Sequence, residues 1–220
     1  MRRTIFSLTV PRALVIETSA RVGCVALAID GAIIIEQQFE HGLQNAAKIL
    51  PIIDELCRGQ RWAPGEIEHI YISIGPGSFT GLRIGVTIAK TLALTTGAKI
   101  VAVPSLLVLA HNAPMTAKHV VVALDAKRGQ VYAARFERRG EEVVEIEPPH
   151  LGRLEDVLSR SPQPVHLITE KDPAPARAEV VAQLGWSMAQ RGHFADPDRL
   201  IPVYIRLPEA EEKWLANQGQ

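Results

Sequence analysis

The first half of the chain combines short apolar runs with longer segments in which apolar residues recur at helical spacing. The runs predict β-strands at residues 13–19, 22–29, 32–40, 69–74 and 99–103. The second and third runs are joined by Asp30 and Gly31, a dipeptide typical of a tight hairpin turn. The helical segments predict helices at residues 42–58, 78–96 and 104–112, with Gly59 and Gly97 placed to end the first two.

The second half repeats this order in a shorter form. Strands are predicted at residues 119–125, 130–137, 142–147 and 165–169, and helices at residues 154–160 and 176–191. Each half begins with an apolar strand that ends in an acid, Glu17 in the first and Asp125 in the second. The repeat predicts an α/β protein of two tandem ribonuclease-H-like lobes, with mixed sheets covered by helices. The lobes are expected at residues 1–112 and 113–200, with a tail at 201–220 that packs back on them. In the tail, residues 204–207 are expected to form a strand or an extended crossing, and residues 209–217 a helix.

Composition excludes several classes of protein. The chain has 24 Lys and Arg against 24 Asp and Glu, so its formal net charge is zero. A broad basic surface for nucleic acid is therefore not expected, because phosphate binding needs clustered positive charge. No apolar stretch approaches the length of a membrane span. Cys24 and Cys57 lie in strand-like and helix-like patterns, and we expect buried free thiols in a reducing cytoplasm.

A glycine-rich segment, GPGSFTGLRIG at residues 75–85, lies between a strand and a long helix. Such a segment lets backbone amides converge at a helix N-terminus, where they favour an anion or a close-packed partner. It lacks the Lys-Ser/Thr of a phosphate-binding loop and the Gly-x-Ser-x-Gly of a serine nucleophile. We therefore expect Ser78 to cap the helix.

Small residues recur every four positions along the predicted helix at 78–96. This ridge comprises Gly81, Gly85, Ala89 and Ala93. It permits close approach either of a partner helix or of the chain's own sheet, and the sequence leaves both uses open. Arg83, beside the ridge, is either a solvated arginine or a cation that reaches a partner's carboxylate or a phosphate.

Four segments together resemble the TsaB family, formerly called YeaZ. They are ALVIETS, ILPIIDEL, GPGSFTGLRIG and ALDAKRGQVYAA, at residues 13–19, 49–56, 75–85 and 123–134. The tail segment LIPVYIR, at residues 200–206, fits the family as well. The resemblance implies the fold of the actin/hexokinase/Hsp70 superfamily. It also implies a cytoplasmic, noncatalytic paralogue of the transferase TsaD. Such a subunit is required to form N6-threonylcarbamoyladenosine (t6A) at adenosine 37 of tRNAs that read codons beginning with adenine.

The resemblance further implies how the chain assembles and which residues take part. It would pair with a TsaD-type transferase, help recruit a TsaE-type ATPase, meet tRNA only indirectly, and form a possible homodimer when alone. The implied partner-binding residues are Leu43, Ala46, Leu50, Ile53, Cys57, Gly81, Arg83, Gly85 and Ala89. The glycine loop comprises Gly75, Pro76, Gly77, Ser78 and Thr80.

Enzymatic alternatives remain open at this point. Glu17 and Asp125 lie where the superfamily's nucleotide-using members carry phosphate-hairpin acids, so the first alternative is an ATP-dependent phosphotransferase. The turn at 168–173 contains no glycine and cannot approach a nucleoside closely, so we expect vestigial acids and no cofactor, with nucleotide only at a partner interface. His111 has no second histidine one helical turn away, so no metal site is expected. The second alternative is a peptidase.

Overall fold

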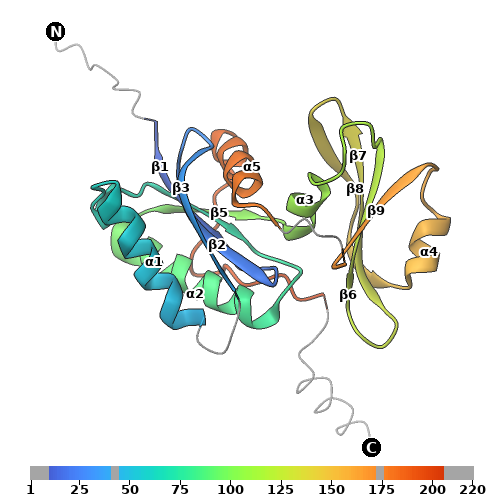
Figure 1. The fold of residues 1–220 in the computed structure, drawn as a ribbon, viewed down its shortest axis with the longest axis horizontal. Coiled ribbons are helices and arrows are strands. Elements are labelled where there is room, and N and C mark those ends of the chain that lie inside the picture. Colours follow the sequence, from blue (N-terminus) through green and yellow to red (C-terminus); the bar gives the residue numbers. More distant parts are fainter. Residues whose placement is uncertain (1–9, 41–44, 172–175, 206–220) are drawn as a thin grey trace, which may run out of the picture.

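The computed structural model describes residues 10–40, 45–171 and 176–205 of the chain, with the side chains of its first helix described from Lys48 onward. These residues form two mixed sheets with helices outside and between them (Figure 1). The predicted tandem α/β architecture is thus confirmed, and nearly every predicted strand is present within two or three residues of its expected ends.

The first sheet has five strands in the order β3-β2-β1-β4-β5. Their bounds are β1 Arg12–Glu17, β2 Val22–Ile29, β3 Ala32–Glu40, β4 His69–Ser73 and β5 Lys99–Val103. The first three strands are antiparallel neighbours, whereas β4 and β5 run parallel to β1. Asp30 and Gly31 form the predicted hairpin turn with φ angles of 54° and 73°, the left-handed conformation that such a turn requires.

The second sheet has four strands in the order β8-β7-β6-β9. Their bounds are β6 His119–Asp125, β7 Val131–Arg139, β8 Glu142–Gly152 and β9 Val165–Thr169. An antiparallel β6-β7-β8 meander is followed by β9, which pairs parallel with β6. The sheet therefore repeats the first one without a counterpart of β5.

Helices cover both faces of the first sheet. Their bounds are α1 Asn45–Gly59, η1 Pro64–Glu66, α2 Phe79–Thr96, α3 Ser105–Ala110, α4 Leu154–Ser159 and α5 Ala178–Gln190. Helices α1 and α2 lie together on the outer face, and α5 crosses the inner face (Figure 1). Helix α3 packs against β6, β7 and β8, and α4 against β7.

The position of α5 differs from the one the sequence suggests. We expected it in the second lobe at 113–200, but it packs across all five strands of the first sheet. The inner face of that sheet carries Ala13, Val15, Ala26 and Ala28, and α1 and α2 both lie on the opposite face. Returning α5 to the first sheet is what buries these apolar side chains.

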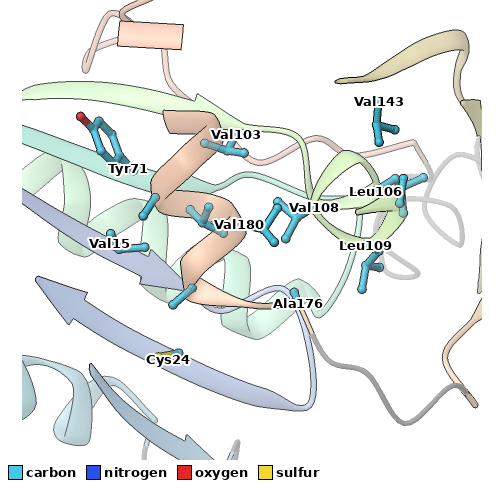
Figure 2. Close-up of a cluster of buried hydrophobic side chains, with 14 of the residues drawn as sticks. Val15, Cys24, Tyr71, Val103, Leu106, Val108, Leu109, Val143, Ala176 and Val180 are labelled. Carbon is cyan, nitrogen blue, oxygen red and sulfur yellow. The ribbon is translucent and has the colours of Figure 1, made fainter. Parts of the chain in front are cut away.

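One hydrophobic core joins the two sheets (Figure 2). Val15 and Tyr71 of the first sheet, Val108 of α3 and Val180 of α5 all belong to it, as does Val143 of the second sheet. A separate core lies between the first sheet and α1 and α2, and a small one lies beneath α4. Because α3 and α5 contribute to the shared core, each sheet depends on a helix encoded in the other half of the chain.

The predicted end of α1 needs revision, whereas the described part of the tail is extended, which is one of the two forms expected for it. Helix α1 continues through Gly59, and the residue in the left-handed conformation after it is Arg61, with φ of 56°. The tail at 201–205 is extended without regular secondary structure, although it does pack back on the chain, with the Val203 amide donating to the Ile74 carbonyl at 2.8 Å. The helix predicted further along the tail lies outside the described residues.

Candidate functional site

The glycine loop is packed tightly against the turn that follows β1. The Ser78 amide donates to the Ser19 carbonyl at 2.7 Å, and a Cβ added at Gly77 would overlap that carbonyl and lie 2.9 Å from Ser19 Cβ. On the other side, the Gly75 amide donates to Ser105 Oγ at 2.9 Å and the Ser105 amide to the Gly75 carbonyl at 3.0 Å. Because Gly77 has no side chain, the loop can lie directly against the turn after β1. The hydrogen bonds of Gly75 join the same loop to α3.

Ser78 occupies the predicted N-cap position of α2. Its hydroxyl accepts the Gly81 amide at 3.3 Å, and its carbonyl accepts the Leu82 amide at 2.9 Å. Thr80 is exposed in the first turn, and Pro76 is buried in the loop. At the other end, Gly97 closes the helix in a left-handed conformation as predicted. The amides at the start of α2 are therefore satisfied in part by the loop itself.

The small-residue ridge of α2 faces the chain's own sheet. Gly81, Gly85, Ala89 and Ala93 are all buried. A Cβ added at Gly85 would overlap the hydroxyl of Thr18 and lie 3.3 Å from Cδ1 of Ile72. Of the two uses left open by the sequence, packing on the sheet is the one the structure shows. These positions can therefore position α2 for a partner but are too buried to contact the partner themselves.

The candidate residues of α1 divide between core and surface. Ile53 and Cys57 are buried in the core beneath the helix, at 6% and 5% exposure. Leu50 is 51% exposed. Leu43 lies outside the described residues, and Ala46 belongs to the helix but its side chain is not described. Among the described side chains of α1, Leu50 is thus the predicted contact residue that is exposed to solvent.

Glu17 is fully buried at the end of β1 and is enclosed by the chain itself. One carboxylate oxygen accepts the amide and the hydroxyl of Ser19, both at 2.6 Å. The other accepts the hydroxyl of Ser73 from β4. Thr18 beside it is also buried, and its hydroxyl has no hydrogen-bond partner among the described residues. The hydrogen bonds to Glu17 therefore fix the β1–β2 turn against β4.

The stability of the protein should depend on the protonation of Glu17. Burial raises the pKa of this carboxyl above its ordinary value of 4.5, and the hydrogen bonds from Ser19 and Ser73 offset only part of the rise. The folded state therefore binds the proton more tightly than the unfolded state. Its contribution to stability is present below pH 4.5 and is lost as the pH rises through the raised pKa.

Glu17→Gln tests this dependence because the amide resembles the protonated acid and does not titrate. Urea unfolding between pH 4.5 and 8 should show the variant gaining stability over the wild type as the pH rises. Glu55→Gln, at an exposed position of α1, controls for the loss of one carboxylate. Parallel profiles for wild type and Glu17→Gln would contradict the prediction.

Asp125 lies in a different environment from Glu17. It is exposed, its carboxylate accepts the Lys127 amide at 2.8 Å, and its own amide donates to Glu170 at 2.9 Å. Lys127, Arg128 and Gly129 all have positive φ angles, so the loop curls over the end of β6. The first residues of the glycine-free turn, through Lys171, are described, and the rest of it lies outside the described residues.

The surroundings of His111, Cys24 and Cys57 indicate structural roles rather than a binding site. His111 follows α3 and its Nδ1 lies 2.9 Å from the Leu107 carbonyl, as expected of a residue at a helix end. Burial lowers its pKa. Cys24 and Cys57 are free and buried as predicted, and burial raises the pKa of Cys24 to about 12. Within residues 10–40, 45–171 and 176–205, no three His, Cys, Asp or Glu side chains gather as a metal site would require.

The structure adds residues that the motifs did not single out. Phe79 and Tyr204 meet at the start of α2 with ring centroids 5.3 Å apart, and Arg83 lies against both. Tyr204 belongs to the tail, 121 residues from Arg83 in sequence. Neither hydrophobic periodicity nor spacing brings such distant residues together, and the one signal was that the tail also fits the family resemblance.

Comparisons with known proteins agree with this geometry. Residues 43–214 match the family model of TsaD, tRNA N6-adenosine threonylcarbamoyltransferase. The chain is 30% identical to the tRNA threonylcarbamoyladenosine biosynthesis protein TsaB of Bacillus subtilis, over 93% of this chain and 98% of that protein. It is 32% identical to the Escherichia coli protein of the same name, over 64% of each. The structure of YeaZ from Pseudomonas aeruginosa matches with a TM-score of 0.74 at 23% identity, over 88% of this chain and 99% of that one.

The duplicated sheets and the shared helices form an α/β fold of the actin/hexokinase/Hsp70 kind. Sequence similarity over nearly the whole chain then decides the family. The chain belongs to the TsaB family. In the part of the chain that the structure describes, no helix is long and apolar enough to cross a membrane.

Proposed function

We propose that this protein is a noncatalytic scaffold subunit for the formation of t6A in tRNA, working in the cytoplasm as a heterodimer with a TsaD-type transferase. In this role it holds the helices of the transferase in a competent arrangement and provides part of the surface that recruits a TsaE-type ATPase. Contact with tRNA is made through the complex. The pathway is supported by the names of its relatives in Bacillus subtilis and Escherichia coli.

The observation that best supports a noncatalytic role is the burial of Glu17 in the β1–β2 turn. Glu17, which stands where a phosphate-hairpin acid would lie, is fully buried and has both oxygens bonded to the chain's own groups. The glycine loop is pressed on the same turn, through Gly77 against Ser19. An acid that is fully buried and hydrogen-bonded within the chain is not exposed to a metal-bound phosphate, and this argues against an autonomous phosphotransferase.

The outer helices are the surface best suited to a partner. Helices α1 and α2 lie side by side on the first sheet, away from the second sheet (Figure 1). Leu50 of α1 and Leu94 of α2 are large apolar side chains exposed by 51% and 68%. Exposed apolar side chains on adjacent helices are typical of surfaces on which the helices of another subunit pack.

Reconstitution tests the proposal directly. The purified chain should bind a TsaD-type transferase in a stoichiometric complex, measured by mass in solution, and should raise t6A output when a TsaE-type ATPase and tRNA are added. Titration calorimetry of the chain alone with ATP and Mg²⁺ is the matching control for the enzymatic alternative. Failure to bind the transferase, or tight ATP–Mg²⁺ binding by the isolated chain, would overturn it.

A further inference from the structure

Arg83 on α2 has an unusual setting for an exposed arginine. Its Nε donates to the hydroxyl of Tyr204 at 2.9 Å, and its guanidinium carbon lies 3.9 Å from the ring centroid of Phe79 and 5.6 Å from that of Tyr204. The side chain is therefore held on one edge and stacked on an aromatic face. An arginine held in this way loses little conformational entropy when it binds.

The tail that supplies Tyr204 is itself anchored beside α2. Leu200 is buried, its carbonyl accepts Lys90 Nζ at 3.2 Å, and the Val203 amide donates to the Ile74 carbonyl at 2.8 Å. The Val203 carbonyl lies 3.3 Å from where a Cβ on Gly75 would be, so the tail also rests on the glycine loop. These contacts fix the hydroxyl that orients Arg83.

The two terminal nitrogens of the Arg83 fork have no partner among the residues that the structure describes. Among the described residues, no carboxylate forms an ion pair with Arg83, and its only hydrogen bond is made by Nε. Nη1 and Nη2 together can bind a carboxylate end-on in bidentate fashion. A planar, oriented fork with no carboxylate beside it in the described part of the chain is complementary to one oxyanion.

The surroundings favour a protein carboxylate over an RNA phosphate. Phe79, Val203 and Tyr204 are exposed by 37% to 40%, and Ile201 by 66%. Aromatic and arginine side chains are enriched in the energetic centres of protein interfaces. Binding of a phosphate backbone takes several clustered cations, whereas the net charge of the chain is zero.

We propose that Arg83, oriented by Phe79 and Tyr204, is a preformed receptor for a carboxylate side chain of the transferase, and that residues 200–205 are part of the partner-binding surface. This inference rests on the proposed function and deepens it. Arg83 makes the contact, and Tyr204 is a positioning residue that acts through it.

The test measures the Kd between the full chain and a TsaD-type transferase. Arg83→Gln should weaken binding about 30-fold, and Arg83→Lys about tenfold because the charge remains without the fork. Tyr204→Phe keeps the ring and removes the acceptor, and should cost about fivefold. In the Arg83→Gln background it should cost nothing further, since Tyr204 acts through Arg83. Arg153→Gln, at the exposed residue before α4, is the matched control and should leave Kd unchanged.

Each outcome decides the matter. If Arg83→Gln leaves the affinity for the transferase intact, the carboxylate receptor is wrong. If that variant instead weakens tRNA binding by the assembled complex, the fork takes a phosphate, which also overturns the proposal. Additive losses in the double variant would refute the positioning role of Tyr204. If the wild-type chain does not bind the transferase at all, the proposed function fails, a result distinct from all of these.

Discussion

Gly185→Ala should destabilise the protein by at least about 3 kcal/mol and lower the yield of folded chain. Gly185 lies in the middle of α5, where alanine would ordinarily stabilise a helix by about 1 kcal/mol. Here the added Cβ would overlap the ring of Tyr71, lying 2.7 Å from its Cβ and 2.8 Å from its Cδ1. Tyr71 is fully buried in β4 within the shared core, so neither partner can move away cheaply.

Denaturant unfolding of Gly185→Ala against Gly59→Ala measures the effect with a matched control. Gly59 is also in a helix, and nothing lies within 4 Å of an added Cβ there. We expect Gly59→Ala to be neutral or slightly stabilising. Tyr71→Leu should recover part of the loss when combined with Gly185→Ala, because it removes the ring that the methyl group meets. Equal stability of the two alanine variants would mean that α5 does not approach β4 this closely.

The strands and turns follow from the sequence because their determinants are local. Asp30 and Gly31 set the hairpin, and the following apolar run continues as β3 as expected. The position of α5 depends instead on which sheet face lacks cover, a property of the whole chain. The contact between Gly185 and Tyr71, more than a hundred residues apart, leaves no periodic trace in either segment.

The candidate site is predicted less completely than the fold. The glycine loop and the Ser78 cap are evident because each residue type suits one local backbone role. The burial of Ile53 and Gly85 is not evident from the sequence. An apolar stripe on a helix can pack on the chain's own sheet or on a partner, and the sequence pattern is the same in both cases. The contact of Arg83 with Tyr204 joins α2 to the tail and needs the three-dimensional structure.

Leu50→Asp should weaken binding to a TsaD-type transferase by about a hundredfold or more and leave the fold intact. Leu50 is half exposed on α1, so a carboxylate there remains hydrated in the free chain. In the complex the same carboxylate would be desolvated against the partner helices, which costs several kcal/mol when no cation meets it. The measurement is Kd by titration calorimetry together with the midpoint of thermal unfolding, which should stay within about 2 °C of wild type.

Two further substitutions separate docking from folding. Ile53 lies three residues further along α1, but Ile53→Asp buries its carboxylate in the core beneath the helix. We therefore expect an unfolded or strongly destabilised chain rather than a folded chain that fails to bind. Ile146→Asp changes a similarly exposed side chain on β8 of the second sheet and should affect neither property. If Leu50→Asp bound the transferase as tightly as Ile146→Asp does, the outer face of α1 would not be the docking surface, and the partner would have to be sought on another face of the two lobes.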